Sequence, residues 1–423
     1  MQIFIITILT IASVVSFWQF ISGSWLRKYQ LSPLWLMLSV WFIAIAISQL
    51  RLSELELIWP GKYWYLLFVS LLSFTLGFFV FDKIWQKYPW WRKFGILTRE
   101  KFSEIKLEYL IYFLFLVSLV ALYMFYKRAG NFPLLAEDPD VFRFEADEKV
   151  PGLINYLSQL ARIFIPLSFF LIFKNHFSWR KYWDLTVIGV IGTVFLILFA
   201  SRTQIFFIDL WIMAMYLLMR KPNLKQALKF YPIFLLISVF VLAAVPLIRQ
   251  YKSYGSGYLA GVTGIDQSNY NPLSKAFVPI YIGVSFNQQA LLHAEQYYRS
   301  HPVQHGKVSL DPFTNIVGLD QYKSNYDLGA IFYSWWNTGT YLFPFVQDFG
   351  DSAFYFAPFF IAGILTLVWH YWKSAMNFLS INLYAYAMFF IVMTVYLSFT
   401  VRAEMYLDLA LLFIAHLFVG YES

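Results

Sequence analysis

Residues 183–219 decide the fold, and they read WDLTVIGVIGTVFLILFASRTQIFFIDLWIMAMYLLM. Two apolar runs, 183–200 and 203–219, meet at the short polar link 201–204. Each run is long enough to cross the hydrocarbon core of a bilayer as a helix. The sequence therefore predicts two successive membrane crossings here, with Arg202 held between them.

Apolar stretches of this length recur along most of the chain. Of its 423 residues, 60% are hydrophobic and 13% are charged, which is typical of a polytopic membrane protein. Helices are expected at 1–22, 33–50, 63–81, 108–127, 152–173, 183–200, 203–219, 229–248, 352–372, 379–399 and 405–420. We therefore predict an all-α polytopic integral membrane protein with about eleven transmembrane helices, within a range of about ten to twelve.

The first of these stretches is expected to stay in the protein. It has no basic region before it and no small-residue cleavage site after it, so residues 1–22 are interpreted as a retained helix and not as a signal peptide.

Charges in the links between the apolar stretches predict the orientation of the chain. Residues 82–107 carry seven Lys and Arg against three acids. The links 174–182 and 220–229 carry three and four Lys and Arg against none. Because basic links stay on the cytoplasmic side, these three links are expected inside. Alternating crossings then place the N-terminus outside, the C-terminus inside and the link with Arg202 outside.

Two longer segments are expected on the outer face of a single transmembrane domain that covers residues 1–423. The first is 128–151, in which residues 128–150 carry three basic and six acidic side chains. The second is a long, partly helical loop, 249–351, with six basic and seven acidic side chains. Within this loop, 276–294 is apolar enough for a re-entrant or interfacial helix, and a full crossing there would reverse every later helix. The aromatic side chains of the loop are expected either to stack on sugars or to lie at the membrane interface.

Several kinds of chemistry are excluded or disfavoured by composition. The chain has no cysteine, which excludes disulfides, thiolate metal sites and thiol catalysis. Its six histidines show no metal-ligand spacing, so no metal site is expected. The net charge of +8 is confined to short links between apolar segments, which favours membrane topology over nucleic-acid binding.

Five arginines from different helices are expected on the outer face: Arg128, Arg143, Arg202, Arg249 and Arg402. An arginine in an outer link opposes the usual topology bias, so an anionic ligand explains Arg202 better than orientation does. Guanidinium groups bind phosphate in a bidentate manner, and several together can hold a diphosphate. Each one alone could instead extend to lipid headgroups, and their common position is what favours a diphosphate site.

Two ionisable residues are expected inside membrane helices, where such side chains are rare and usually face a cavity or a partner. They are Arg162 in 152–173 and Asp209 in 203–219. Either they pair with each other as an internal ion pair, or both line a polar cavity that opens outward and in which Arg162 joins the diphosphate ligands.

Residues 337–350 read NTGTYLFPFVQDFG and precede the helix expected at 352–372. A carboxylate at the mouth of a membrane cavity, beside a diphosphate site, can deprotonate a sugar hydroxyl as general base, an effect of about 10² to 10⁴ in rate. Asp348 is therefore the expected base, and Glu137, Asp138 and Asp140 are the alternatives. Asp is also favoured near helix N-termini, so a capping role for Asp348 at 352–372 stays open.

From about residue 108 onward the chain resembles the bacterial oligosaccharide repeat-unit polymerases of the Wzy type. The resemblance rests on four features in order: Gly130-Asn131-Phe132-Pro133-Leu134 followed by Arg143; Ser201-Arg202 in a short outer link; the long outer loop after Arg249; and Asn337-Thr338 leading to Asp348-Phe349-Gly350.

This resemblance implies a membrane-embedded, GT-C-like glycosyltransferase that needs neither metal nor cofactor. The enzyme would lie in the bacterial inner membrane with its active site on the extracytoplasmic face. It would transfer a growing O-antigen, capsule or exopolysaccharide chain from undecaprenyl diphosphate to the non-reducing end of a new lipid-linked unit. Its implied partners are the lipid-linked donor and acceptor, membrane lipid, a chain-length-determining co-polymerase and a flippase.

The resemblance also assigns expected roles to residues of this sequence. Arg143, Arg202 and Asp348 are expected to act in catalysis, and Asn337, Thr338 and Tyr341 to contact the glycan.

Two other functions remain open at the level of sequence. An O-antigen ligase has similar helices and uses a histidine in its large outer loop, for which His293, His301 and His305 are candidates. A lipid-linked oligosaccharide flippase or other transporter would also place charged groups in a membrane cavity. Against a transporter, the chain shows no inverted repeat of broken helices.

Overall fold

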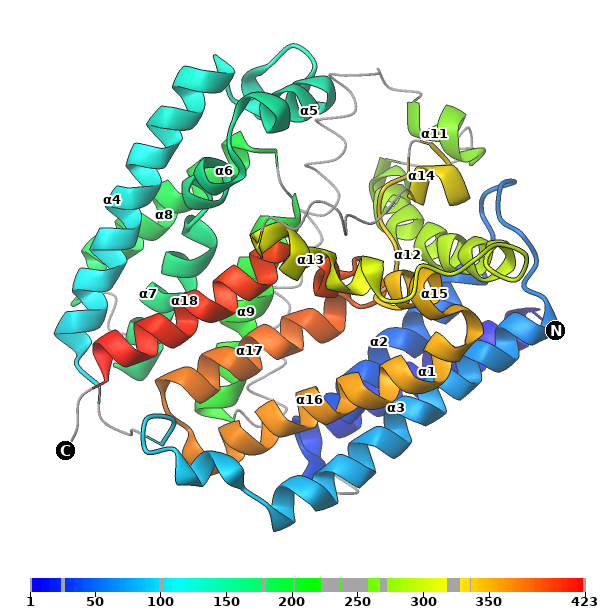
Figure 1. The fold of residues 1–423 in the computed structure, drawn as a ribbon, viewed down its shortest axis with the longest axis horizontal. Helices are drawn as coiled ribbons and strands as arrows, with labels where there is room; N and C mark the ends of the chain where they lie inside the picture. Colours follow the sequence, from blue (N-terminus) through cyan, green and yellow to red (C-terminus); the bar gives the residue numbers. More distant parts are fainter. Residues whose placement is uncertain are drawn as a thin grey trace. The chain divides into compact units, whose positions relative to one another are not determined.

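Apart from an isolated bridge, the regular secondary structure of the residues that the structure describes is helical (Figure 1). The computed structural model describes residues 2–23, 27–98, 102–175, 180–200, 202–221, 236, 258–266, 272–317, 328–334 and 336–420. Within these ranges the sole β interaction is an isolated bridge between Phe102 and Gly420. The predicted all-helical class is thus confirmed for this part of the chain.

Six helical segments among the described residues are long and apolar enough to cross a membrane. They are α1 (Gln2–Ser22), α3 (Gly61–Lys87), α4 (Glu104–Ala129), α6 (Gly152–Ser158) together with α7 (Ala161–Lys174), Thr203–Arg220 of α9 (Arg202–Arg220), and α15 (Phe343–Phe349) together with α16 (Ala353–Ala375). Shorter apolar helices are α2 (Pro33–Ser48), α8 (Trp183–Leu198) and α17 (Phe378–Met393). These helices indicate a membrane protein.

The remaining helices are shorter or more polar. They are α5 (Pro139–Lys149), α11 (Tyr258–Thr263), α12 (Pro272–Tyr297), α13 (Lys307–Val317), α14 (Leu328–Ile331) and α18 (Ala403–Val419), with 3₁₀ turns η1 (Arg27–Tyr29), η2 (Trp90–Lys93), η3 (Pro133–Leu135), η5 (Gly350–Ser352) and η6 (Phe399–Val401). Every apolar stretch expected from the sequence has a helical counterpart where it is described. The stretch 229–248 lies outside the described residues, apart from Leu236.

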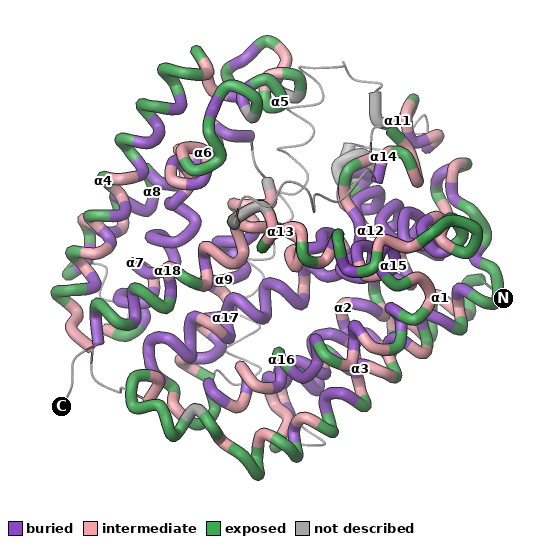
Figure 2. Tube along the Cα trace, viewed as in Figure 1, coloured by how far each residue is buried: buried purple, intermediate pink, exposed green. Residues whose placement is uncertain are grey.

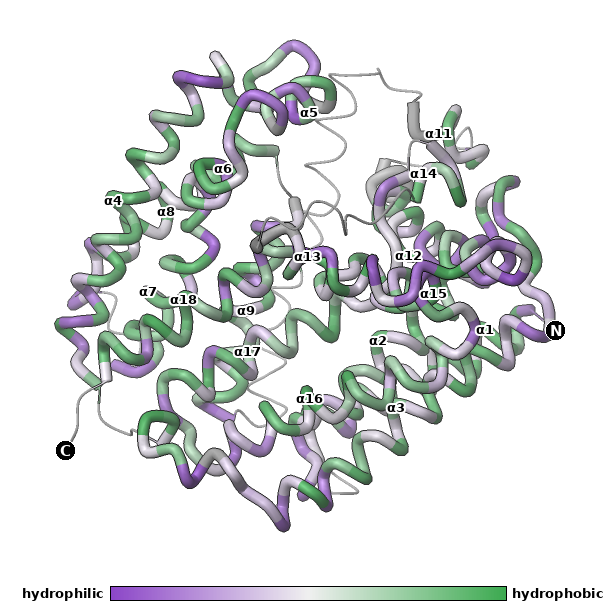
Figure 3. Tube along the Cα trace, viewed as in Figure 1, coloured by the Kyte–Doolittle hydropathy of each residue, from purple (hydrophilic) through white to green (hydrophobic). Residues whose placement is uncertain are grey.

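Helix α4 shows what a lipid-facing surface looks like in this chain. Its outward side chains Phe113, Leu116 and Val120 are large, apolar and more than half exposed. Figures 2 and 3 show the same helix as exposed and largely hydrophobic over much of its length. An apolar surface of this extent is stable in contact with lipid rather than water.

The chain divides into two compact units. Unit 1 comprises residues 1–98 and 281–410, and unit 2 comprises residues 99–280 and 411–423.

Close helix packing in unit 1 depends on glycine. Helices α3 and α16 lie side by side (Figure 1). A Cβ atom on Gly77 would lie 2.6 Å from the carbonyl oxygen of Phe359, and one on Gly363 would lie 2.7 Å from the ring of Phe81. The two glycines therefore let the helix backbones approach, as small residues do in membrane helix pairs.

Polar contacts join three helix ends of unit 1. Asp82 near the end of α3 pairs with Lys28 of η1 at 3.0 Å and with His370 of α16 at 2.8 Å. Lys373 donates from Nζ to the carbonyl oxygen of Lys28 at 2.9 Å. The α1–α2 link and the C-terminal ends of α3 and α16 thus meet at one end, which the charge count predicts to be cytoplasmic.

Helix α12 contains the stretch 276–294, for which the sequence allowed a re-entrant, an interfacial or a membrane-spanning helix. It is not one of the six candidate crossings. Its unit 1 portion carries fully buried polar side chains: Ser285, Asn287, Gln288, Gln289 and, at 1% exposure, Glu295. Buried polar groups are costly unless hydrogen-bonded, and several of these side chains bond to neighbouring segments. Such a helix suits the protein interior better than contact with lipid.

One of these neighbouring segments is the link between α2 and α3. The Glu56 carboxylate accepts hydrogen bonds from the hydroxyls of Tyr281 and Ser285 and from the backbone N–H of Ser53. Burial raises the pKa of Glu56 above its usual 4.5, although these hydrogen bonds oppose the rise. Gln289 holds the same link by bonding to both the N–H and the C=O of Leu57.

In unit 2 the helix expected at 152–173 is broken. Helix α6 ends at Ser158 and α7 begins at Ala161. Ser118 of α4 donates to the carbonyl oxygen of Ser158 at 3.1 Å, and Gln204 of α9 donates to the side chain of Gln159 at 2.7 Å. The first bond satisfies a backbone carbonyl at the break, and the second joins the Gln159 side chain at the break to α9.

Candidate functional site

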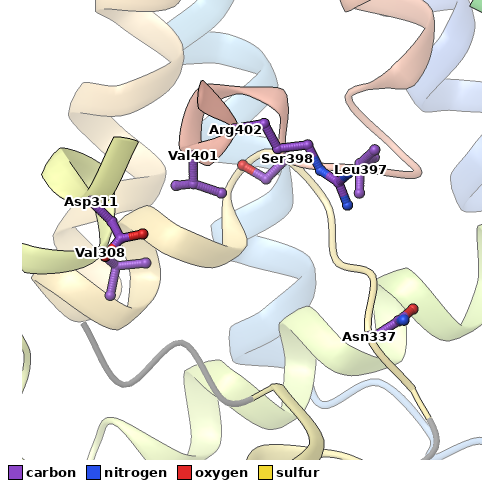
Figure 4. Close-up of a pocket in the computed structure, with 7 residues that line it drawn as sticks. All are labelled: Val308, Asp311, Asn337, Leu397, Ser398, Val401 and Arg402. Carbon is purple, nitrogen blue, oxygen red and sulfur yellow. The ribbon is translucent and has the colours of Figure 1, made fainter. Parts of the chain in front are cut away.

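A pocket of about 240 Å³ in unit 1 combines four kinds of polar group. Its lining comprises Val308, Asp311, Asn337, Leu397, Ser398, Val401 and Arg402, which Figure 4 shows as sticks. A carboxylate, an amide, a hydroxyl and a guanidinium therefore face one space, together with three aliphatic side chains. Ligand sites typically have this mixture of apolar walls and a few placed polar groups.

Two segments that the sequence predicts on the outer face build this pocket. Val308 and Asp311 come from α13, and Asn337 lies in the non-helical stretch before α15 (Figure 4). These belong to the loop 249–351. The other lining residues lie in or next to η6, in the predicted outer link between α17 and α18. Both segments thus line one pocket, and their side of the membrane stays a prediction.

Arg402 presents its cation in a weakly paired state. The nearest carboxylate oxygen of Glu404 lies 3.8 Å from its guanidinium, and both side chains are close to half exposed. Exposed pairs of this kind contribute little, about 0 to 1 kcal/mol. A ligand with a phosphate or carboxylate can therefore compete for Arg402 at small cost.

Asp348 lies in a different environment from the one expected. The sequence placed it at the mouth of a cavity, whereas its side chain is fully buried and does not line the pocket. Its Oδ1 accepts the backbone N–H of Val308 at 3.0 Å, and its Oδ2 accepts the N–H and the hydroxyl of Ser309 at 2.7 and 2.6 Å. The expectation of an accessible carboxylate is thus wrong, because both oxygens bind the first turn of α13. Nor does Asp348 cap the helix at 352–372: it lies within α15 and caps α13 instead.

This contact makes Asp348 a support of the pocket. Helix N-termini leave N–H groups without intrahelical partners and favour negative charge. Asp348 supplies both an acceptor and a charge at the start of α13, one turn before Asp311. The position of Asp311 at the pocket therefore depends on Asp348.

The sequence did not single out five of the lining residues: Val308, Asp311, Leu397, Ser398 and Val401. Asp311 is one of seven acidic residues in 249–351, and nothing in the spacing separates it from the others. The signal in the sequence was the amphipathic pattern of 307–317, which contains Asp311. The apolar side chains of Leu310 and Phe313 in this helix are exposed.

The expected glycan contacts separate into different roles. Asn337 lines the pocket. Thr338 donates from Oγ1 to the Asn287 side chain at 3.0 Å. Tyr341 is 1% exposed and packs edge-on against Trp41 with ring centroids 5.6 Å apart, so its ring is part of the core of unit 1.

The expected diphosphate ligands lie in both units, and their convergence stays a prediction. Arg128 at the end of α4 and Arg143 on α5 are exposed side chains of unit 2. The backbone of Arg202 begins α9. Arg249 lies outside the described residues.

Arg162 follows the break between α6 and α7 and does not lie in the middle of a continuous helix as expected. It is 4% exposed, and its guanidinium lies 4.7 Å from the centroid of the Tyr156 ring. Asp209 is buried as well, at 8% exposure. The hydrogen bond between Gln204 and Gln159 brings the start of α9, two residues after Arg202, next to this break. Unit 2 thus buries Arg162 and Asp209, and Arg162 and Arg202 each lie within three residues, along the chain, of a member of the hydrogen-bonded pair Gln159 and Gln204.

The alternative bases are less enclosed. Asp138 accepts the N–H of Val141 at 3.1 Å and so caps α5, while Glu137 is exposed. The side chain of Asp140 lies outside the described ones.

The three histidines considered for a ligase lie in separate surroundings. His293 packs against Phe332 with ring centroids 5.0 Å apart, and burial lowers its pKa. His301 stacks on Tyr297 at 3.8 Å. The backbone N–H of His305 bonds to the carbonyl oxygen of Asp348 at 3.1 Å.

Comparison of the chain with known protein families, with curated proteins and with solved structures found no match.

Proposed function

We propose that this protein is a membrane glycosyltransferase that polymerises lipid-diphosphate-linked oligosaccharide units on the outer face of a bacterial inner membrane. One observation carries the proposal. Asn337 and Arg402, which the sequence singles out 65 positions apart, line one pocket together with the carboxylate of Asp311. The resemblance to the Wzy-type polymerases, in the order of its motifs, supports the same function.

The pocket suits a sugar that carries or adjoins a charged group. The amide of Asn337, the hydroxyl of Ser398 and the carboxylate of Asp311 can exchange hydrogen bonds with sugar hydroxyls, and Arg402 can bind a phosphate oxygen. The aliphatic side chains of Val308, Leu397 and Val401 complete the wall.

In the proposed reaction the acceptor hydroxyl attacks the anomeric carbon of the growing chain. The bond from that carbon to the diphosphate oxygen breaks, and lipid diphosphate leaves with the bonding electrons. Asp311 takes the proton of the acceptor hydroxyl, a role for which Asp348 is less suited because both of its oxygens already bind α13. Arginines stabilise the negative charge that develops on the diphosphate. Arg402 is the proposed ligand in unit 1, and Arg128, Arg143, Arg162, Arg202 and Arg249 remain the proposed ligands elsewhere.

The test uses purified protein in liposomes with the lipid-linked units that accumulate in cells lacking this gene. A ladder of lipid-linked polymer, formed without nucleotide sugar and with release of lipid diphosphate, is the expected result. Units moved across the bilayer without release of lipid diphosphate would instead identify a flippase, and a single transfer to lipid A would identify a ligase.

Variants test whether the reaction takes place in the pocket. Asp311→Asn should abolish the ladder, by roughly a hundredfold or more in rate, at unchanged thermal stability. Arg202→Ala should also remove it. The matched control is Asp351→Asn, because Asp351 is a partly exposed acid of the same unit that pairs with Lys62 outside the pocket. Full activity of Asp311→Asn would exclude Asp311 as the base.

A further inference from the structure

Two chain segments contribute to the pocket besides α13, and one buried side chain is hydrogen-bonded to both of them. The first segment contains Asn337, and the second contains Leu397 and Ser398 and begins at Tyr396. The buried side chain is Asn287 of α12.

The hydrogen bonds of Asn287 use its whole amide. Its Oδ1 accepts from Nε1 of Trp336 at 3.2 Å and from Oγ1 of Thr338 at 3.0 Å. Its Nδ2 donates to the carbonyl oxygen of Tyr396 at 2.7 Å and to that of Gly283 within α12. An amide has two donor hydrogens and two acceptor lone pairs, so the side chain is fully satisfied.

These partners flank the pocket residues. Trp336 and Thr338 are the immediate neighbours of Asn337 on both sides, so their bonds to Asn287 fix the backbone from which Asn337 projects. Tyr396 precedes Leu397 and Ser398, and its carbonyl oxygen accepts the hydrogen bond that joins the second segment to α12. A buried polar network that is fully satisfied specifies one arrangement of the groups that it joins.

Gly283 allows the second segment to lie close to α12. A Cβ atom at Gly283 would lie 2.8 Å from the ring of Tyr396. The absence of a side chain there lets Tyr396 pack directly on α12, one turn before Asn287.

We infer that Asn287 is a positioning residue of the pocket, which fixes Asn337 and Ser398 relative to each other. This inference rests on the proposed function for its kinetic consequence, but its geometric content does not depend on the reaction. Asn287 touches no lining side chain of the pocket through its own hydrogen bonds and acts through Trp336, Thr338 and Tyr396.

Helix α12 supplies a matched control. Gln289 is also a fully buried amide, and it holds the α2–α3 link through Leu57 with bonds of 3.2 and 3.1 Å. Gln289→Ala therefore removes a comparable buried amide from the same helix and keeps the hydrogen bonds of Asn287 to both pocket segments.

The first measurement is spectroscopic and needs no substrate. Because the natural chain has no cysteine, Asn337→Cys provides a single thiol for a nitroxide spin label. Adding Asn287→Ala should increase the mobility of this label, whereas adding Gln289→Ala should leave it unchanged. Equal label mobility in all three proteins, or equal loosening by both alanine variants, would overturn the inference.

The second measurement is kinetic and uses unlabelled protein. Asn287→Ala should lower kcat/KM for polymerisation by at least about tenfold, mainly through a higher KM for the lipid-linked acceptor, because a displaced group weakens binding and orientation. Gln289→Ala should retain the wild-type KM even if its melting temperature falls.

A milder variant covers the case in which Asn287→Ala does not reach the membrane. Thr338→Val keeps the side-chain volume and removes one of the two donors to Oδ1, so it should loosen the label at position 337 at near-normal protein abundance. An unchanged label in this variant would overturn the inference. If the wild type forms no polymer, the proposed function fails, while the spin-label comparison still decides the role of Asn287.

Discussion

Replacing Asp348 by asparagine distinguishes a supporting carboxylate from a catalytic one. The fully buried carboxylate accepts three hydrogen bonds from the first turn of α13. Asparagine has nearly the same shape but only one acceptor oxygen. If that oxygen faces Ser309, the amide N–H₂ must face the N–H of Val308, so two donors oppose each other.

The free-energy cost follows from these contacts. A hydrogen bond to a charged group contributes about 1.5 to 3 kcal/mol. Loss of a negative charge at a helix N-terminus costs about 0.3 to 1 kcal/mol. Because contributions in one network are not additive, we expect Asp348→Asn to lower the free energy of unfolding by about 2 to 4 kcal/mol. Polymerisation should fall as a consequence, since α13 carries Val308 and Asp311 to the pocket.

The assay compares thermal unfolding and polymerisation of purified Asp348→Asn, Asp311→Asn and Asp351→Asn in the same detergent. A supporting role predicts that Asp348→Asn loses both stability and activity, whereas Asp311→Asn loses activity alone and Asp351→Asn keeps both. An Asp348→Asn protein with wild-type stability and no polymerisation would refute this reasoning and return Asp348 to the role of general base.

Two further predictions concern stability. Glu56→Gln should flatten the pH dependence of unfolding: burial raises the pKa of Glu56 in the folded state above 4.5, so its contribution to stability is present below that pH and is lost as pH rises through the folded value. Thermal unfolding between acidic and neutral pH checks this, and identical slopes for variant and wild type would contradict it. Gly77→Ala should destabilise the packing of α3 on α16 by about 1 to 3 kcal/mol, because its Cβ would lie 2.6 Å from a backbone oxygen. The matched control is Gly61→Ala, where the added Cβ meets no atom within 4 Å, and equal melting temperatures of the two variants would show that the close approach is unimportant.

Membrane helices were predictable from sequence because lipid imposes a constraint along the chain itself. A segment that crosses the bilayer must satisfy its backbone as a helix and present apolar side chains over about 20 residues. This constraint is why α1, α4 and α16 begin and end within a few residues of the expected stretches. The break between α6 and α7 was not predictable, because the side chains that bond to it, Ser118 and Gln204, come from other helices.

Arg402 was also identified from sequence, through its place in a predicted outer link, and Asn337 was identified through the family resemblance, but their meeting in one pocket was not predicted. Asp348 and Asp311 show why. Both are acids of the same loop, 37 positions apart, and the local sequence pattern does not show which of the two carboxylates faces a ligand. Contacts between α15 and α13 bury one carboxylate against N–H groups and leave the other at the pocket. The sequence by itself determined the helical membrane class and the segments between the helices, since those follow from local hydrophobicity and charge. Only the tertiary structure decided which polar side chain supports the site and which one lines it, because that choice depends on hydrogen bonds between residues far apart in the chain.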